Sequence, residues 1–509
     1  MAYSAQRFTR LAHRLSWSVT LFCALIIGII LISYLYYSLQ SYRGPSPIYF
    51  CIILLLYLVS KKAAFFSIVF LLPIAPALHE QLSFIHQPAV PFFIATPGID
   101  ICTAFIVGTM LNNIAEHQKL LMKAERVPWP IAVTLIIIIF SIALAVFRNF
   151  TQVSQGFNFA ELVTKLLVHK LVLRGDIYLP LVDIFTFSTG ALFIGILVNF
   201  FKTNSDSEKL FVMALACTLC ISAVWGIFQA LTRFGLPPTT YAHRANDFFY
   251  GAHGFQPDLH AFGALMLMGC LGLLGYFNYA PAYRTKVYLG GVILISWTAL
   301  LMSKSRASLA FAIAGTTIFI ILKILHKGKP VFFSNYLFTI CAVMIGITAV
   351  PLFVTSQFVR DIYPSEYLNF SLWNDALSLR PEFHRTALRM FADFPWFGIG
   401  QGNFIRVSAD PILKYSPLIL TWGGENAHNY FLQTLAELGV IGVLSFILLF
   451  VWPLIFTKTI YIAPACMIIT SIFLGNIYSH SLIVRENLFV LGIVIALTYS
   501  KMKTRQKIP

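Results

Sequence analysis

The sequence predicts an all-α protein, a polytopic membrane bundle whose chain crosses a lipid bilayer about fourteen times. Of the 509 residues, 58% are hydrophobic and 11% are charged, whereas ordinary soluble proteins are about 25% charged. The apolar residues also gather in repeated runs of about twenty, the length that spans a hydrocarbon core of roughly 30 Å. Because backbone groups in lipid must be satisfied within their own segment, these runs are predicted to be helices.

The predicted helices are separated by links that are rich in proline or in charge. We place them near 16–38, 46–60, 63–78, 99–116, 129–147, 178–201, 210–232, 258–279, 286–302, 307–325, 331–354, 440–457, 460–479 and 487–500. Three regions follow: residues 1–354 with the first eleven helices and short loops, 355–439 as one large loop, and 440–509 with the last helices and a tail.

The basic residues of the short links predict the orientation, since cytoplasmic links carry an excess of lysine and arginine. Alternate links hold most of them, for example Lys61 and Lys62, Lys202 and Lys209, and Arg284 with Lys286. Both chain ends are therefore expected in the cytoplasm. The longer loops, 79–98, 148–177, 233–257 and 355–439, are expected on the outer side.

The net charge of +16 raises the possibility of nucleic-acid binding, but its distribution argues against it. Most basic residues lie in links between apolar runs and form no basic face interleaved with aromatic residues. All eight cysteines fall within or at the ends of apolar runs. Cys217 and Cys220 lack both the partner ligands of a zinc site and the βαβ context of a redox motif, so we interpret them as packing residues.

The large outer loop holds arginines that membrane topology does not explain. The segment 381–394 is predicted to form an amphipathic helix, with Pro381 at its first position and Pro395 ending it. Its apolar stripe consists of Phe383, Ala387, Met390, Phe391 and Phe394. Arg385 and Arg389 lie four residues apart on another face. They either form a solvated face or clamp an anion, because the guanidinium fork matches phosphate oxygens.

A glycine-rich stretch follows, from Trp396 to Phe404, with glycines at 398, 400 and 402. Such a turn can point backbone N–H groups at an anion. It can equally be a plain turn. A dinucleotide fingerprint is excluded because no strand precedes it.

The segment from Glu425 to Gly439 is predicted to begin a helix. Asn426 suits the N-cap and Gly439 the end of the helix. His428 would then lie in the first helical turn, where the positive end of the helix dipole disfavours imidazolium. A neutral ring at that position can accept a proton.

Two further groups are candidates on the outer side. Lys304 and Arg306 lie in a tight link between two predicted helices, where they either extend toward the membrane surface or face a cavity mouth. The loop before residue 261 contains Arg244 and several histidines, His253 among them. Their spacing matches no familiar zinc site.

These residues resemble a known family. The stretch Glu425 to Gly442 is similar to the signature of the O-antigen ligase and O-antigen polymerase family. Arg385 with the turn at 395–404 resembles the element that precedes the signature, and 303–308 resembles the family's Ser-Arg step at the head of a membrane helix. The similarity covers roughly 250–450. Where relatives commonly carry an Arg-Ala…Gly-x-Phe…Pro-Asn run, this chain has Gly251 to Asp258, and Arg244 would replace the missing arginine.

The resemblance implies a glycosyltransferase of the GT-C type in the bacterial inner membrane, with its active site on the periplasmic side. The donor would be a glycan on undecaprenyl pyrophosphate, the acceptor lipid A-core or a growing glycan, and no cofactor or metal would be needed. His428 matches the essential histidine, and Arg306 and Arg385 match the arginines that contact pyrophosphate. Arg389 and Arg244 would assist. Possible supporting residues are Lys304, Glu425, Asn429 and His253.

Several alternatives remain open from the sequence. The same family includes polymerases of O-antigen or exopolysaccharide repeat units, and protein O-oligosaccharyltransferases are a third possibility. A transporter or flippase would place ionisable residues on broken helices in repeated halves. Here the charged groups gather in outer loops and at helix ends.

Overall fold

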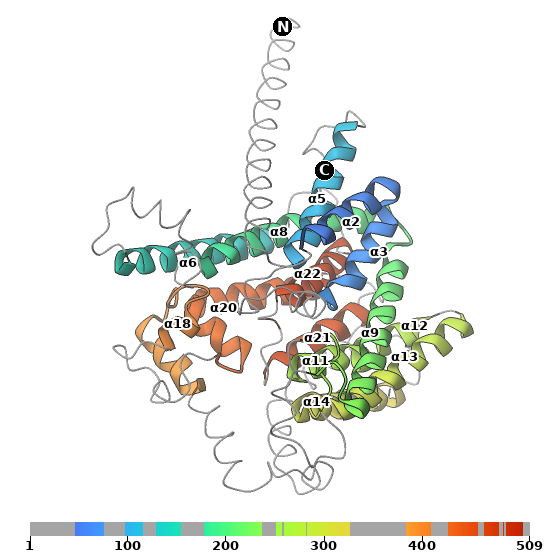
Figure 1. The fold of residues 1–509 in the computed structure, drawn as a ribbon. Coiled ribbons are helices and arrows are strands. Elements are labelled where there is room, and N and C mark those ends of the chain that lie inside the picture. Colours follow the sequence, from blue (N-terminus) through green and yellow to red (C-terminus); the bar gives the residue numbers. More distant parts are fainter. Residues whose placement is uncertain are drawn as a thin grey trace, which may run out of the picture.

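The structure is a computed structural model of the whole chain (Figure 1). It describes residues 46–75, 97–115, 129–153, 178–236, 251–256, 259–280, 282–325, 383–408, 426–456, 463–477, 482 and 485–501. Within these ranges the regular structure is helical throughout and contains no strand. The all-α prediction is confirmed for this part of the chain.

The helices follow the apolar runs of the sequence. They are α2 (Ser46–Val59), α3 (Lys61–Leu71), α5 (Pro97–Ala115), α6 (Trp129–Val153), α8 (Tyr178–Thr203), α9 (Ser207–Thr232), α11 (Leu259–Leu267), the π-helical turn η3 (Met268–Gly272), α12 (Leu273–Tyr279), α13 (Tyr283–Met302), α14 (Arg306–Leu325), α18 (Phe404–Ser408), α20 (Tyr430–Phe456), α21 (Ala463–Ile477) and α22 (Arg485–Ser500). The predicted spans 16–38 and 331–354 lie outside the described residues.

Five stretches in the described part are long and apolar enough to cross a membrane: Thr186–Thr203, Ser207–Thr232, Leu259–Asn278, Tyr283–Met302 and Tyr430–Leu449. Shorter apolar helices accompany them, such as Trp129–Ala145 and Arg306–Ile321. The chain is therefore a membrane protein. The count of about fourteen spans stays a prediction.

Helix ends that the sequence predicts on the same side of the membrane contact one another. At one end, Lys62 Nζ lies 3.0 Å from Asp206 Oδ2, and Lys501 Nζ lies 2.9 Å from Glu208 Oε2. These pairs join the start of α3 and the end of α22 to the start of α9.

The opposite helix ends are joined by a second set of contacts. Gln256 Nε2 donates to the Pro73 carbonyl just after α3 at 2.6 Å. The Gly98 N–H at the start of α5 donates to Glu486 Oε1 at the start of α22 at 3.1 Å. The two ends of the bundle are thus each tied together by polar groups.

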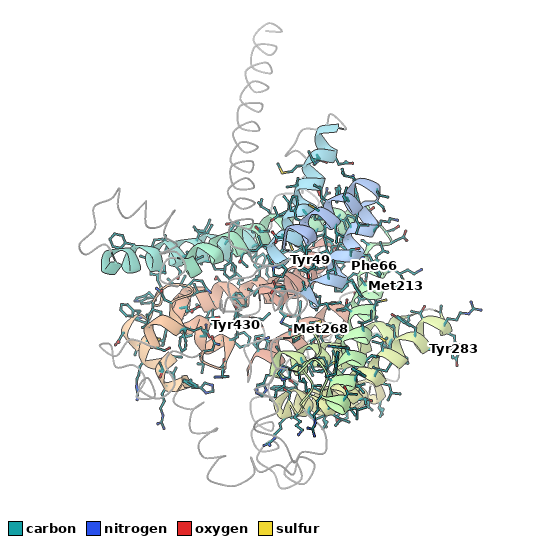
Figure 2. The ribbon with its side chains drawn as sticks, viewed as in Figure 1. Tyr49, Phe66, Met213, Met268, Tyr283 and Tyr430 are labelled. Atoms are coloured by element: carbon teal, nitrogen blue, oxygen red, sulfur yellow. The ribbon has the colours of Figure 1, made fainter. Side chains whose placement is uncertain are left out.

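The segment α11–η3–α12 lies at the centre of one half of the bundle and packs against α9, α13, α14 and α21. Close approach there depends on small residues, since a Cβ at Gly269 would lie 2.4 Å from Ser296 Oγ. Met268 and Tyr430, both labelled in Figure 2, are 7% exposed and belong to the same buried core. The central segment therefore shares one core with the start of α20.

A second group of helices contains α6, α8, α20 and α22, in which α6 packs on α20 and on α8, and α8 packs on α22 (Figure 1). Leu438 of α20 joins Ile138 and Ile142 of α6 in a small apolar cluster. This contact positions the first part of α20, which follows the predicted catalytic segment.

Candidate functional site

The helix within the signature stretch 425–442 begins later than predicted. It begins at Tyr430, and its N-cap is Asn429, whose Oδ1 accepts the N–H groups of Phe431 and Leu432, both at 3.0 Å. The prediction of Asn426 as N-cap is wrong. Asn429 takes this place because its side chain satisfies two backbone donors that the first turn otherwise leaves without partners.

His428 therefore precedes the helix rather than lying in its first turn, which corrects the predicted position. Its φ of 51° lies in the left-handed region, which non-glycine residues adopt at a conformational cost. The side chain is half-buried. Its ring centroid lies 5.5 Å from that of Phe383, with the ring planes inclined by 30°. A strained backbone thus presents the imidazole beside the first described turn of another helix.

That other helix, 383–393, carries the predicted pair of arginines. Phe383, Ala387 and Met390 are buried, and this face packs through Ala387 and Met390 into a cluster with Ala427 and Ala436. The helix ends before Pro395, as predicted. Phe394 is 38% exposed, so its assignment to the buried stripe is wrong. It lies beyond the last helical residue, where the helical spacing no longer applies.

Arg385 and Arg389 are both exposed on the helix 383–393. They lie four residues apart and so project from one face, while Phe383 of the same helix contacts His428. The structure therefore brings the helix that carries both arginines against the histidine segment. Pro381 lies outside the described residues.

The glycine-rich turn donates its backbone N–H groups to protein acceptors. Ile399 N donates to the Ala436 carbonyl and Gly400 N to the Glu437 carbonyl, each at 2.9 Å. Gln401 N donates to Ser141 Oγ of α6 at 3.1 Å. Because these donors are occupied, the plain-turn interpretation is favoured over an anion cradle. The turn fastens the arginine-bearing helix to α20 and α6.

Glycine is required in this turn for two reasons. Gly398, Gly400 and Gly402 have φ values of 66°, 102° and 82°, which side chains disfavour. A Cβ at Gly398 would lie 2.3 Å from the Glu437 carbonyl group. The turn and the helix therefore pack backbone against backbone.

Gly439 breaks α20, as predicted, with φ 67° and ψ −170°. A Cβ there would lie 2.4 Å from the Trp396 carbonyl group. The Val440 N–H, freed by the break, donates to the Pro395 carbonyl at 2.8 Å. The break accommodates the turn and separates the part of α20 next to His428 from the apolar part beyond.

The link before α14 presents the other predicted cations. Lys304 has a φ of 58°, and Ser303 Oγ accepts the Ser305 N–H at 3.1 Å. This tight turn places Arg306 at the first position of α14. Both basic side chains are partly exposed.

His253 lies in a loop that docks on this link. The neighbouring Ala252 N–H donates to the Met302 carbonyl at 3.1 Å, and the Gly254 N–H donates to Gln229 Oε1 of α9 at 2.7 Å. The histidine loop is therefore held beside Lys304 and Arg306. Arg244 and Glu425 lie outside the described residues.

The described contacts thus form two groups, one around His428 with the 383–393 helix and one around the link at Arg306. Helix α21 packs on both α14 and α20, and the ring centroid of Phe473 of α21 lies 4.3 Å from that of Phe431, with the ring planes inclined by 41°. Convergence of Arg306 with His428 stays a prediction. Among the described residues, no three histidine, cysteine or acidic side chains gather as metal ligands would.

Two residues that the sequence did not single out hold the His428 group together. Ser141 of α6 accepts the Gln401 N–H and donates to the Glu437 carbonyl at 3.2 Å. Gln433 connects the loop before α20 to Glu437. The spacing 429, 433, 437 on one helix face was a usable signal for Gln433. No local signal marks Ser141, which lies in a distant apolar run.

The fold and the two groups of contacts define a helical membrane protein. Its apolar helices hold the segments that carry His428, Arg385 and Arg389. A family model described as O-antigen ligase matches residues 291–447, the part of the chain that holds α14, the 383–393 helix and the His428 segment. Over this region, somewhat under a third of its length, the chain is similar to the O-antigen ligase family. No curated protein matches the chain significantly.

Proposed function

We propose that the protein transfers a glycan from undecaprenyl pyrophosphate to an acceptor hydroxyl at the periplasmic face of the bacterial inner membrane. The reaction we favour is ligation of O-antigen to lipid A-core. The observation that supports this most is the contact between His428 and Phe383 at 5.5 Å. It places a potential base beside the helix that carries Arg385 and Arg389.

The reaction has two chemical requirements. The acceptor hydroxyl must lose a proton as it attacks the anomeric carbon, and the pyrophosphate must leave with its negative charge stabilised. A positioned base contributes about 10²–10⁴-fold to such a step. His428 takes this role, either removing the proton or orienting the acceptor. Direct displacement inverts the anomeric carbon.

The leaving group requires positive charge, because stabilisation of developing charge is often the largest part of catalysis. Arg385 and Arg306 would bind the pyrophosphate, with Arg389 and Arg244 in support. The guanidinium fork suits phosphate oxygens. Lys304, Asn429, Glu425 and His253 are secondary candidates. Asn429 already caps α20, so its proposed contribution is to hold the loop that presents His428.

The test uses purified protein in lipid nanodiscs with an undecaprenyl-pyrophosphate-linked glycan and lipid A-core. We expect His428→Ala to abolish transfer, while His260→Ala, a half-buried histidine at the start of α11, leaves it intact. Both variants must be present at wild-type level. Wild-type transfer by His428→Ala would overturn the proposed role of His428.

A deletion strain distinguishes ligation from polymerisation. Loss of ligation leaves long polymer on the lipid carrier, whereas loss of polymerisation leaves single repeat units on the core. A transporter would instead show no transfer at all when purified with donor and acceptor.

A further inference from the structure

We infer that Gln433 and Glu437 are positioning residues for His428, acting through a chain of hydrogen bonds from the Glu437 carboxylate to the Ala427 backbone. We call this Glu437–Gln433–Ala427 series the positioning chain. The inference rests on the proposed function, in which His428 is the base.

The chain follows one face of the first part of α20. Asn429, Gln433 and Glu437 are spaced by four residues, so their side chains lie above one another on the helix. Gln433 is 8% exposed and Glu437 is 3% exposed. Burial of two such polar side chains is costly unless they are hydrogen-bonded. Gln433 contacts the loop before the helix, and Glu437 contacts the glycine turn and α18, whereas Asn429 caps the helix itself.

Gln433 connects the other two members of the chain. Its Nε2 donates to Glu437 Oε1 at 3.4 Å, and its Oε1 accepts the Ala427 N–H at 3.5 Å. The carboxylate, which accepts only, therefore fixes which end of the amide faces the loop. Ala427 is fully buried and is bonded directly to His428, whose left-handed backbone is costly to maintain. By accepting the Ala427 N–H, the Gln433 amide thus holds the backbone directly before His428 in place.

Glu437 is itself held in place from two other directions. Its Oε1 also accepts the Phe404 N–H of α18 at 3.1 Å. Its backbone carbonyl accepts from Gly400 N at 2.9 Å and from Ser141 Oγ at 3.2 Å. The anchor of the positioning chain is therefore fixed to the glycine turn and to α6. A displacement of the glycine turn would therefore move Glu437, and through Gln433 it would displace the backbone next to His428.

The polarity of the chain allows a reciprocal exchange of side chains as a test. In Gln433→Glu, two carboxylates face each other and the donor to Glu437 is lost. In the double variant Gln433→Glu/Glu437→Gln, the new amide at 437 can donate to the carboxylate at 433. That carboxylate can still accept the Ala427 N–H, and the amide oxygen at 437 can accept the Phe404 N–H. The number of side-chain atoms is unchanged.

The experiment measures glycan-transfer kinetics and hydrogen exchange of the peptide that contains 426–429, for each variant in nanodiscs. We expect Gln433→Glu to lower kcat by roughly 10- to 100-fold, because a displacement of about 1 Å can cost a catalytic group about 10²-fold. The KM for the donor should stay within about twofold, since the pyrophosphate contacts are untouched. Exchange at 426–429 should rise. The double variant should recover most of kcat and of the exchange protection.

An equally impaired double variant, or wild-type kcat and exchange in Gln433→Glu, would overturn the positioning chain. If exchange rises and recovers while transfer is unaffected, the chain holds the loop but His428 is not the base, and the proposed function fails instead. Should Gln433→Glu fold poorly, Gln433→Met removes the amide without adding charge and should show the same loss of kcat and protection.

Discussion

The ring of Phe383 lies against the ring of His428, with 5.5 Å between their centroids and 30° between their planes. Phe383 opens the described part of the arginine-bearing helix, and His428 immediately precedes the cap of α20. This pair is one direct contact between the two segments of the proposed active site, beside the cluster that Ala387 and Met390 form with Ala427.

Phe383→Ala should therefore weaken the packing of the 383–393 helix and lower the rate of glycan transfer. Loss of a buried phenylalanine side chain costs about 3–5 kcal/mol, and the imidazole loses the surface that it packs on. Thermal unfolding in detergent and transfer rate measure the two effects. Leu388→Ala changes a 47% exposed residue of the same helix and should alter stability by at most about 0.5 kcal/mol. Equal behaviour of the two variants would contradict the packing role of Phe383.

Arg385→Lys should raise the KM for the pyrophosphate-linked donor by about tenfold or more, because lysine keeps the charge and loses the bidentate fork. Initial rates over a range of donor concentrations give KM and kcat separately. Arg284→Lys, at an exposed position in the first turn of α13, is the matched control and should behave as wild type. Full activity of Arg385→Lys at low donor concentration would show that Arg385 has only a structural role.

Gly400→Ala should destabilise the docking of the glycine turn on α6. The φ of 102° disfavours a side chain, and the added Cβ would lie 2.5 Å from Ala145 Cβ. We expect a lower unfolding temperature and a loss of transfer. Gly291→Ala provides the control, since nothing lies within 4 Å of its Cβ position. Within a helix this change should stabilise by about 0.5–1 kcal/mol. A normal Gly400→Ala protein would mean that the turn does not dock as described.

Orientation can be tested by labelling with a membrane-impermeant maleimide in a cysteine-free background. Trp396 in the glycine turn is 65% exposed. Tyr283 at the start of α13, which Figure 2 labels, is 80% exposed. In cells with a permeabilised outer membrane, Trp396→Cys should be labelled and Tyr283→Cys should not. After disruption of the inner membrane both should react. The reverse pattern would place the His428 segment in the cytoplasm and remove the periplasmic reaction.

Much of the fold was predictable because the membrane imposes a local rule. Each apolar run had to satisfy its own backbone, so α2, α9 and α13 begin and end within a few residues of their predicted bounds. The breaks at Pro395 and Gly439 were also predictable, since both residues restrict the backbone wherever they occur.

The arrangement around His428 was not predictable in the same way. Asn426 and Asn429 are equally good caps by residue type. The choice of Asn429 accompanies the packing of Ala427 and Ala436 against the 383–393 helix and the hydrogen bond from Ala427 to Gln433. From the sequence alone, the N–H groups of the glycine turn could bind either an anion or acceptors within the protein. In the structure, α20 and α6 supply the acceptors.

The sequence by itself determined that this is a helical membrane protein, and its signature residues indicated a similarity to the O-antigen ligase family. Hydropathy and residue type are sufficient for that, because they act over one helix or one turn. Only the tertiary structure decided that His428 precedes α20 in a left-handed conformation, against Phe383 and behind the buried pair Gln433 and Glu437. Those positions depend on competition among hydrogen-bond partners far apart in the chain, which is decided by packing.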